Sequence, residues 1–338
     1  METVAGSVGP ARTEPVRPGK AIPVGSPRRS LWKRLAGPQN NTLWFWVFVG
    51  PFVVGLVAFV VVPIVWSLWL SLFEARNTLS PTEFVGLRNY GDMLTDPAFR
   101  SSLQTFVAFA AFIVPLTFAC SLSLALLVNR ARVARTFFRS VFFIPVACSY
   151  VVASLIWKVS IFNGVRFGLA NTVLRALGFE GRQWLSRPDP PLYWVVIVSE
   201  RLWLQVGFYM LLFLAGLQRI PAVLYEAASV DGASRGWQTF RYITFPQLRA
   251  TSAAVLVLLL ISAFQAFDEF YNLLVNAGAS SYPPYARPPL VYLYYVALGR
   301  QQDFGHGSAG AVILTLIIAT FTLIQGRLLG FGRRESYG

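Results

Sequence analysis

The sequence predicts an all-α integral membrane protein with six transmembrane helices, and three observations support this prediction. The chain of 338 residues is 55% hydrophobic, and its mean hydropathy is +0.54. Only 13% of its residues are charged, about half the fraction usual in a soluble domain. Residues 42–73 contain no charged side chain, and an apolar run of at least about 18 residues is typical of a helix that crosses a membrane.

Six apolar segments set the expected helix boundaries, because backbone groups surrounded by lipid must find their hydrogen bonds within a helix or a closed sheet. The expected spans are 42–72, 103–128, 138–157, 192–216, 251–274 and 308–326. The first contains Pro51 and Pro63, so we expect a kink or a break in it.

The distribution of basic residues predicts the orientation of these spans. The net charge of +14 does not indicate nucleic-acid binding, because the basic residues lie between apolar runs. They gather in 1–40, in 129–137, in 217–250 and at the C-terminal end, with 158–191 as the one opposing segment. Since cytoplasmic loops are enriched in Lys and Arg, we expect both termini and the loop 217–250 in the cytoplasm.

Composition divides the chain into three parts. Residues 1–40 are rich in Pro, Gly and Arg, and we expect a disordered, basic cytoplasmic tail. Residues 41–331 form the six-helix transmembrane domain, and 332–338 form a short cytoplasmic C-terminal tail. Both cysteines, Cys120 and Cys148, fall inside apolar runs, which argues against a disulfide framework.

The segment 221–246 predicts a helix–turn–helix between the fourth and fifth spans. Pro221 suits the first position of a helix, and Asp231-Gly232 is a stop-and-turn signal. A second short helix is expected from Ser234 to Tyr242, ending near Pro246. Small side chains in this segment would let the surface of another protein approach closely.

This segment resembles the EAA loop of the permease subunits of ABC importers. The residues that carry the resemblance are Glu226, Ala227, Ala228, Asp231, Gly232, Ala233 and Pro246. Residues 84–90, 142–145 and 213–217 are similar to the sugar-permease branch of that family. The resemblance covers about residues 42–331 and implies a fold like that of type I ABC importer permeases, with a cytoplasmic coupling loop at about 220–247.

The resemblance also implies partners, a location and a mechanism. The first helix of the loop would sit in a groove of an ATPase subunit, with Glu226 accepting hydrogen bonds or pairing with a basic group and Gly232 permitting the turn. The assembly would contain a second, non-identical permease, two ATPase subunits or domains and an extracytoplasmic solute-binding protein, in contact with membrane lipid. The expected location is the bacterial cytoplasmic (inner) membrane, crossed several times.

The chain carries no motif for catalysis. No phosphate-binding loop of the form GxxxxGK[ST] occurs, so ATP and Mg must bind to the partner subunits, and we expect no cofactor in this chain. His306 is the single histidine and no cysteine lies near it, which excludes a metal site built on histidine and cysteine. No acid–base pair presents itself, so we expect that the chain is not an enzyme.

Polar residues inside the spans are candidates for the solute path, because they are costly in lipid. Arg201, Gln205 and Tyr209 share one face of the fourth span, although Arg201 could instead pair with an acid elsewhere in the bundle. In the fifth span Gln265, Asp268 and Asn272 are three and four residues apart, which predicts one shared face. These three either line the outer part of a polar cavity or lie at its mouth, hydrogen-bonded to loops.

Together these features predict a permease subunit that moves a sugar, a di- or oligosaccharide, by alternating access coupled to separate ATPase subunits. Glycerol 3-phosphate is the alternative cargo, but its phosphate would favour several arginines, and only Arg201 lies within an expected span. A stand-alone secondary transporter would call for internal repeats, and none is clear.

Overall fold

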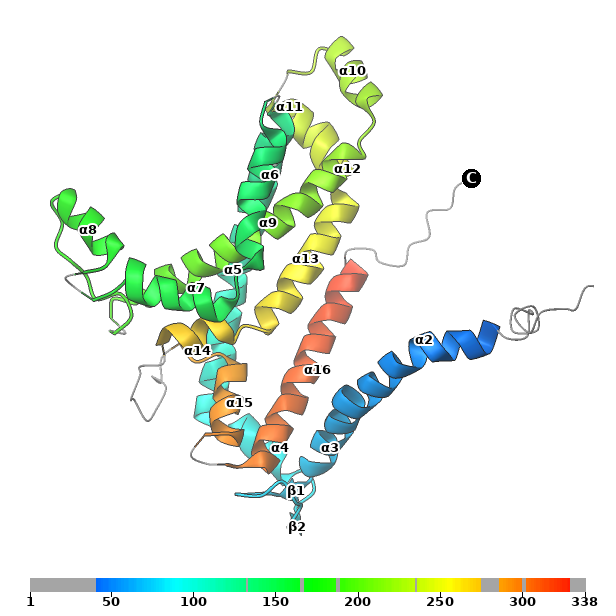
Figure 1. Cartoon of the computed structure of the whole chain (residues 1–338), viewed down its shortest axis with the longest axis vertical. Helices are drawn as coiled ribbons and strands as arrows, with labels where there is room; N and C mark the ends of the chain where they lie inside the picture. Colours follow the sequence, from blue (N-terminus) through cyan, green and yellow to red (C-terminus); the bar gives the residue numbers. More distant parts are fainter. Residues whose placement is uncertain are drawn as a thin grey trace, which may run out of the picture. The chain divides into compact units, whose positions relative to one another are not determined.

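The computed structural model describes residues 41–131, 133–164, 167–186, 189–234, 236–274, 286–299 and 302–328 (Figure 1). The predicted tails, 1–40 and 332–338, lie outside these residues. The chain divides into two units, Met1–Val62 and Pro63–Gly338. All of the candidate site residues belong to the second unit.

The first predicted span is helical from Asn41 to Leu70, in the segments α2 (Asn41–Leu56), η2 (Val57–Val61) and α3 (Val62–Leu70). The irregularity expected from its prolines is a turn of π-helix at η2 and not a break. Pro63 has no backbone N–H to donate, and the wider turn before it keeps the preceding N–H, that of Val62, bonded to the Val57 carbonyl.

The second unit is almost entirely helical. A short antiparallel hairpin pairs Phe73 with Phe84 and Glu74 with Glu83. The elements are β1 (Phe73–Glu74), β2 (Glu83–Phe84), α4 (Arg88–Thr95), α5 (Pro97–Arg130), α6 (Arg135–Phe143), η3 (Ile144–Ala147), α7 (Tyr150–Ile156), η4 (Trp157–Ile161), α8 (Leu169–Ala176), α9 (Tyr193–Gln218), α10 (Ala222–Val230), α11 (Trp237–Thr239), η5 (Phe240–Thr244), α12 (Phe245–Gln247), α13 (Arg249–Phe264), α14 (Asp268–Leu274), α15 (Pro289–Ala297) and α16 (Phe304–Leu328).

Among the described residues, four helices are long and apolar enough to cross a membrane, and the number rises to six if each of two sharply bent pairs is one span. The third predicted span is one of these pairs. It bends by 97° between Ala147 and Tyr150, because Cys148 and Ser149 are extended. The Ser149 side chain then accepts a hydrogen bond from the Val152 N–H and caps α7.

The fifth predicted span also differs from the expected straight helix over 251–274. It begins earlier, at Trp237, and bends by 71° at Leu248 between α12 and α13. It ends at Phe264, after which Gln265, Ala266 and Phe267 separate α13 from α14. The apolar run therefore continues beyond the end of the helix.

Helices α5, α9 and α13 pack against one another at the centre of the second unit. One buried cluster joins α9 to both neighbours through Met210, Phe213, Leu122 and Val255. A second buried cluster lies around Phe109, Ile197 and Phe270 and brings α14 against α9. The buried residues of both clusters are 0–9% exposed, so these helices form one packed body.

Two sets of connecting segments lie at opposite ends of the second unit (Figure 1). The end of α5 lies with α10 and α11 at one end (Figure 1). At the other end the Arg76 side chain donates to Asp303 at 3.0 Å, and Asn89 donates to the Ser71 and Phe73 carbonyls at 2.9 Å. Burial raises the pKa of the Asp303 carboxyl, but hydrogen bonds from His306 and the charge of Arg76 outweigh burial and hold the pKa below its usual range.

The close contact between α9 and α6 gives a test of the packing. A Cβ atom added to Gly207 would lie 1.8 Å from the Phe142 carbonyl oxygen. We expect Gly207→Ala to destabilise the protein by about 1–3 kcal/mol and to lower its melting temperature in detergent. Gly91→Ala on α4 is the matched control, because its added Cβ would meet no atom within 4 Å. Equal melting temperatures for the two variants would contradict this packing.

Candidate functional site

The predicted coupling loop begins with α10, which ends in a Schellman turn. The Ala233 N–H bonds to the Ala228 carbonyl at 2.9 Å, and the Gly232 N–H bonds to the Ser229 carbonyl at 3.4 Å. These two bonds satisfy carbonyls that a helix end leaves free. Gly232 has φ +78°, a backbone conformation that favours glycine, so the Asp231-Gly232 signal was interpreted correctly as a turn.

The second helix of the loop begins later and runs further than predicted. Gly236 has φ +137°, which is not a helical conformation, and α11 begins after it at Trp237. The Ser234 N–H donates to the Gln238 side-chain oxygen at 2.7 Å, which ties the turn to the new helix. Pro246 does not end this helix, because the π-helical turn η5 precedes it and α12 continues to Gln247.

The loop exposes the residues that the family resemblance selected. Glu226, Ala227, Asp231, Gly232 and Pro246 are exposed, and Ala228 and Ala233 are half-buried. Large apolar side chains are also exposed in the described part of the loop, among them Val230, Trp237 and Tyr242. A hydrogen bond of 3.2 Å between the Tyr225 and Thr244 hydroxyl oxygens links α10 to η5, so the two halves of the loop are connected to each other.

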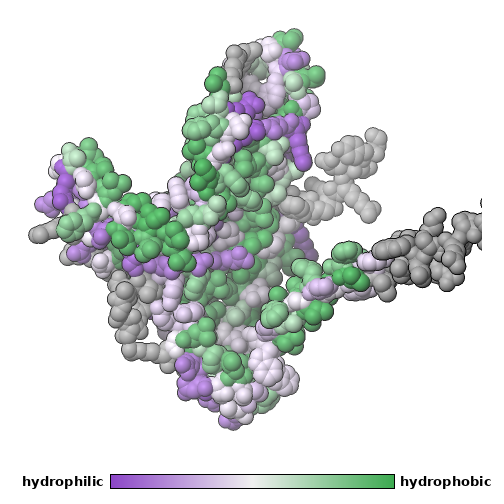
Figure 2. Space-filling view, viewed as in Figure 1, coloured by the Kyte–Doolittle hydropathy of each residue, from purple (hydrophilic) through white to green (hydrophobic). Residues whose placement is uncertain are grey.

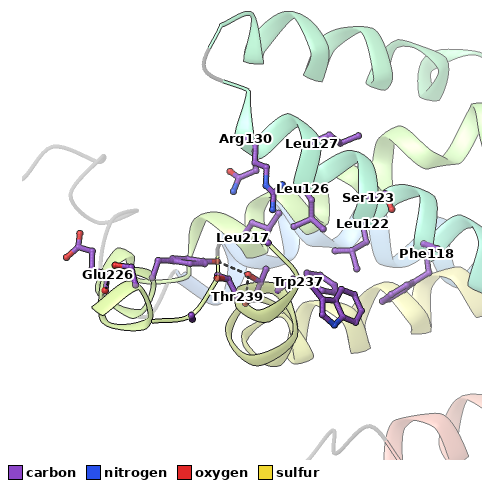
Figure 3. A pocket seen from close by; sticks show the side chains of 18 residues that line it. Phe118, Leu122, Ser123, Leu126, Leu127, Arg130, Leu217, Glu226, Trp237 and Thr239 are labelled. Carbon is purple, nitrogen blue, oxygen red and sulfur yellow. Dashed lines mark hydrogen bonds between the residues drawn. The ribbon is translucent and has the colours of Figure 1, made fainter. Parts of the chain in front are cut away.

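A groove of about 1190 Å³ separates α10 and α11 from the end of α5 (Figure 3). Its floor carries apolar side chains of α5 and α9, including Phe118, Leu122 and Leu217. Trp237 lies across the groove from α5, and Glu226 lies at its far rim (Figure 3). The coupling loop therefore stands off the helix bundle and presents its own surface.

A second polar group lies inside the bundle and is centred on α9. Nη1 of the Arg201 guanidinium donates to the Glu269 carboxylate. Nη2 donates to the Ser262 hydroxyl at 3.0 Å. Arg201 and Glu269 are each 2% exposed. Beside them the Ser154 hydroxyl donates to buried Glu200 at 2.6 Å. Of the two alternatives for Arg201, the structure shows the ion pair.

Gln205 and Tyr209 extend this polar group along α9 to a pocket of about 190 Å³. The Gln205 amide donates to the Tyr150 and Ser262 hydroxyl oxygens, each at 2.8 Å. Tyr150, Gln205 and Tyr209 line the pocket together with Cys148 and the apolar residues Val146, Leu204 and Phe208. Space-filling colours show polar side chains between largely apolar surfaces of the bundle (Figure 2).

The prediction of a shared face for Gln265, Asp268 and Asn272 is wrong. Gln265 ends α13 and Asp268 begins α14, so the periodicity of a single helix does not apply to them. The Asn272 amide donates to the Asp268 carbonyl at 2.8 Å within α14. Gln265 and Asp268 are exposed, and Asn272 is half-buried.

Sequence reasoning missed three members of the polar group: Tyr150, Ser262 and Glu269. Glu269 was visible as a carboxylate within an apolar run, but a straight helix would have placed it off the Gln265 face. Tyr150 reaches Gln205 because α7 starts afresh after the bend at Ser149. The described residues contain no group of three or more His, Cys, Asp or Glu that could hold a metal ion.

Comparison with known proteins finds a matching family model and similar permease proteins. Residues 118–329 match the family model described as "Binding-protein-dependent transport system inner membrane component". The arabinooligosaccharides transport system permease protein AraP of Bacillus subtilis is 32% identical over 325 residues, covering 95% of this chain and 99% of the relative. The trehalose/maltose transport system permease protein MalF of Thermococcus litoralis is 31% identical over 288 residues, covering 85% and 94%.

Solved structures share the fold. A chain from the crystal structure of a bacterial ABC transporter that imports the acidic polysaccharide alginate superposes with a TM-score of 0.74 at 20% sequence identity. The superposition covers 90% of this chain and 99% of that chain. At this identity the likeness supports the architecture of the bundle alone.

The Schellman turn gives a test of the rigidity of the coupling loop. We expect Gly232→Ala to accelerate amide hydrogen exchange across residues 222–233 about 5-fold, because a left-handed residue with a Cβ costs about 1 kcal/mol. Asparagine also ends helices in this conformation, so Gly232→Asn serves as the conservative control and should exchange more slowly than the alanine variant. Identical exchange in all three proteins would contradict a turn that depends on glycine.

Proposed function

This chain belongs to the family of binding-protein-dependent transport system inner membrane components, the permease subunits of ABC importers for sugars and oligosaccharides, and we propose that its own cargo is a neutral di- or oligosaccharide. The chain is a multi-pass inner membrane protein and is not itself catalytic. The observation that carries the proposal is the uncharged character of the pocket beside α9. Two phenols and an amide, those of Tyr150, Tyr209 and Gln205, are its polar lining.

These groups suit a sugar for two reasons. Hydroxyls and amides both donate and accept hydrogen bonds, and sugar hydroxyls need both. Tyrosine rings add apolar surface that can pack against the faces of a sugar ring. The pocket of about 190 Å³ is small, so we propose that it contacts one ring of the cargo while the second permease supplies the rest of the path.

Glycerol 3-phosphate fits this site less well. A phosphate group favours arginine donors with free N–H groups. The Arg201 guanidinium is already engaged by the Glu269 carboxylate, which compensates its charge. The names of the two relatives described above, which refer to arabino-oligosaccharides, trehalose and maltose, also favour a sugar as the cargo of this chain.

For coupling, we propose that α10 docks on a separate ATPase subunit in the cytoplasm. Its exposed face carries Glu226 and Ala227, with Val230 at its end. Closure of two ATPase subunits on ATP would carry the docked loop, and the loop would move α9 and α13, to which it is joined on either side. Alternating access then follows from a two-state change of the bundle. We therefore also propose that both termini lie in the cytoplasm.

The cargo can be tested with the assembled importer in proteoliposomes, with its second permease, ATPase subunits and cognate binding protein. ATP hydrolysis is measured with maltotriose, arabinotriose, lactose or glycerol 3-phosphate present. We expect at least one of the three sugars to stimulate hydrolysis and glycerol 3-phosphate to have no effect, because the pocket lacks an unengaged guanidinium. Stimulation by glycerol 3-phosphate alone would overturn the proposed cargo.

The coupling role of Glu226 gives a separate prediction. We expect Glu226→Ala to reduce sugar-stimulated ATP hydrolysis about 10-fold or more, because a hydrogen bond to a charged group is worth about 1.5–3 kcal/mol. The binding protein should still associate with the complex, which pull-down can measure. Glu83→Ala, which removes an exposed carboxylate from β2 at the other end of the unit, is the control. Normal hydrolysis in the Glu226 variant would remove this residue from the coupling interface.

A further inference from the structure

The break between α13 and α14 leaves a backbone carbonyl that the helices themselves do not satisfy. Where α13 ends, the Gln265 N–H returns to the Ile261 carbonyl and the Ala266 N–H to the Ala263 carbonyl, each at 3.2 Å. The Ser262 carbonyl lies between these two acceptors. It receives its hydrogen bond from Nη2 of Arg201, on the neighbouring helix α9, at 2.5 Å.

The same guanidinium reaches across the break. Its Nη1 donates to the Glu269 carboxylate, in the first turn of α14. Arg201 therefore contacts the last turn of α13 and the first turn of α14 at once. Its charge suits both contacts, because a helix C-terminus carries partial negative charge and Glu269 is a carboxylate.

The Ser262 hydroxyl group connects Arg201 to the candidate cargo pocket. Nη2 of Arg201 also donates to the Ser262 hydroxyl oxygen at 3.0 Å. That hydroxyl accepts from the Gln205 amide at 2.8 Å and hydrogen-bonds to the Tyr209 phenol. Gln205 in turn holds the Tyr150 hydroxyl. The Tyr150, Gln205 and Tyr209 side chains that line the pocket are thus all connected to Ser262.

Arg201 itself does not line the pocket. Its side chain is 3% exposed, its guanidinium carbon lies 5.3 Å from the centre of the Phe109 ring, and it is not among the residues of the pocket wall. A solute in the pocket would therefore meet Gln205 and Tyr209 without meeting the guanidinium.

We propose that Arg201 is a positioning residue: it bridges the break between α13 and α14 and thereby holds Ser262 where it orients Gln205, Tyr209 and Tyr150 toward the cargo. The proposal rests on the proposed function for the identity of the pocket as a cargo site. It assigns Glu269 as the partner that fixes the guanidinium. The charged pair lies outside the pocket, and it contributes to the recognition of a neutral cargo by holding Ser262 in place.

A purely structural ion pair would behave differently when both of its charges are removed. Loss of one partner leaves a buried charge without compensation, whereas neutral replacement of both partners is often tolerated. If Arg201 must also donate to Ser262, neutral replacement of both partners does not restore the arrangement, because methionine has no hydrogen-bond donor. The double variant Arg201→Met with Glu269→Gln therefore separates the two roles.

Cys148 supplies a readout that needs no cargo. It lies in the pocket wall with Tyr150, Gln205 and Tyr209, and the chain contains two cysteines. With Cys120→Ser, maleimide labelling of this subunit reports Cys148 alone. The labelling rate is measured in the assembled importer for four variants: Arg201→Met, the double variant, Arg201→Lys, and Arg88→Met as the control. Arg88 is exposed and forms a 3.8 Å surface pair with Asp92, and such pairs contribute little.

We expect labelling about 10-fold faster in Arg201→Met and in the double variant, because both lose the charged hydrogen bonds to Ser262. Arg201→Lys should give an intermediate rate, since one ammonium keeps the charge but lacks the planar fork that reaches both partners. Arg88→Met should label like the parent. If size-exclusion chromatography shows that Arg201→Met does not assemble, the labelling rates of the lysine and double variants test the proposal.

Three results would overturn the proposal. If Cys148 in the double variant is labelled at the parental rate, Arg201 and Glu269 form an ion pair with no positioning role. A parental rate in Arg201→Lys would show that the fork is not needed. Parental labelling in all variants, with a raised KM for the stimulating sugar in Arg201→Met, would show direct contact with the cargo. The proposed function fails separately, if no sugar stimulates ATP hydrolysis by the parent importer.

Discussion

The backbone N–H and carbonyl groups of a helix in lipid must form their hydrogen bonds within the protein. The architecture of this chain depends on the groups that supply these hydrogen bonds where a helix bends or ends. Lipid offers no hydrogen bonds to a free N–H or carbonyl. The bend before α7 is capped by the Ser149 side chain. The prolines at 63 and 246 follow turns of π-helix. The end of α13 takes a hydrogen bond from Arg201.

These compensations also create the polar interior. Each break in a span releases backbone groups, and polar side chains serve them. Arg201, Glu269 and Ser262 lie where α13 ends, and Tyr150 lies where α7 begins. A break in a helix thus gathers hydrogen-bonding groups, and the charges of Arg201 and Glu269 compensate each other. What remains at the pocket surface is uncharged and suited to a hydroxylated solute.

The coupling loop follows a different rule, because it lies at the end of the bundle. Its conformation comes from local backbone bonds: a Schellman turn at Gly232 and a side-chain bond from Gln238 to the Ser234 N–H. Among the described residues, the Tyr225–Thr244 hydrogen bond also links its two halves. The conformation of the loop therefore depends mainly on contacts within the loop itself.

Hydrophobic runs and an Asp-Gly pair were enough to predict the membrane class, the spans that are continuous helices and the turn that ends α10. These signals act over a few neighbouring residues. The breaks at Ser149 and after Phe264, and with them the partners of Arg201 and Gln205, could be seen only in the packed bundle. The apolar runs continue through both breaks, so hydropathy carries no mark of them. The groups beside them receive hydrogen bonds from α9, to the Tyr150 hydroxyl after the first break and to the Ser262 carbonyl at the second, and α9 is distant in sequence and adjacent only in the fold.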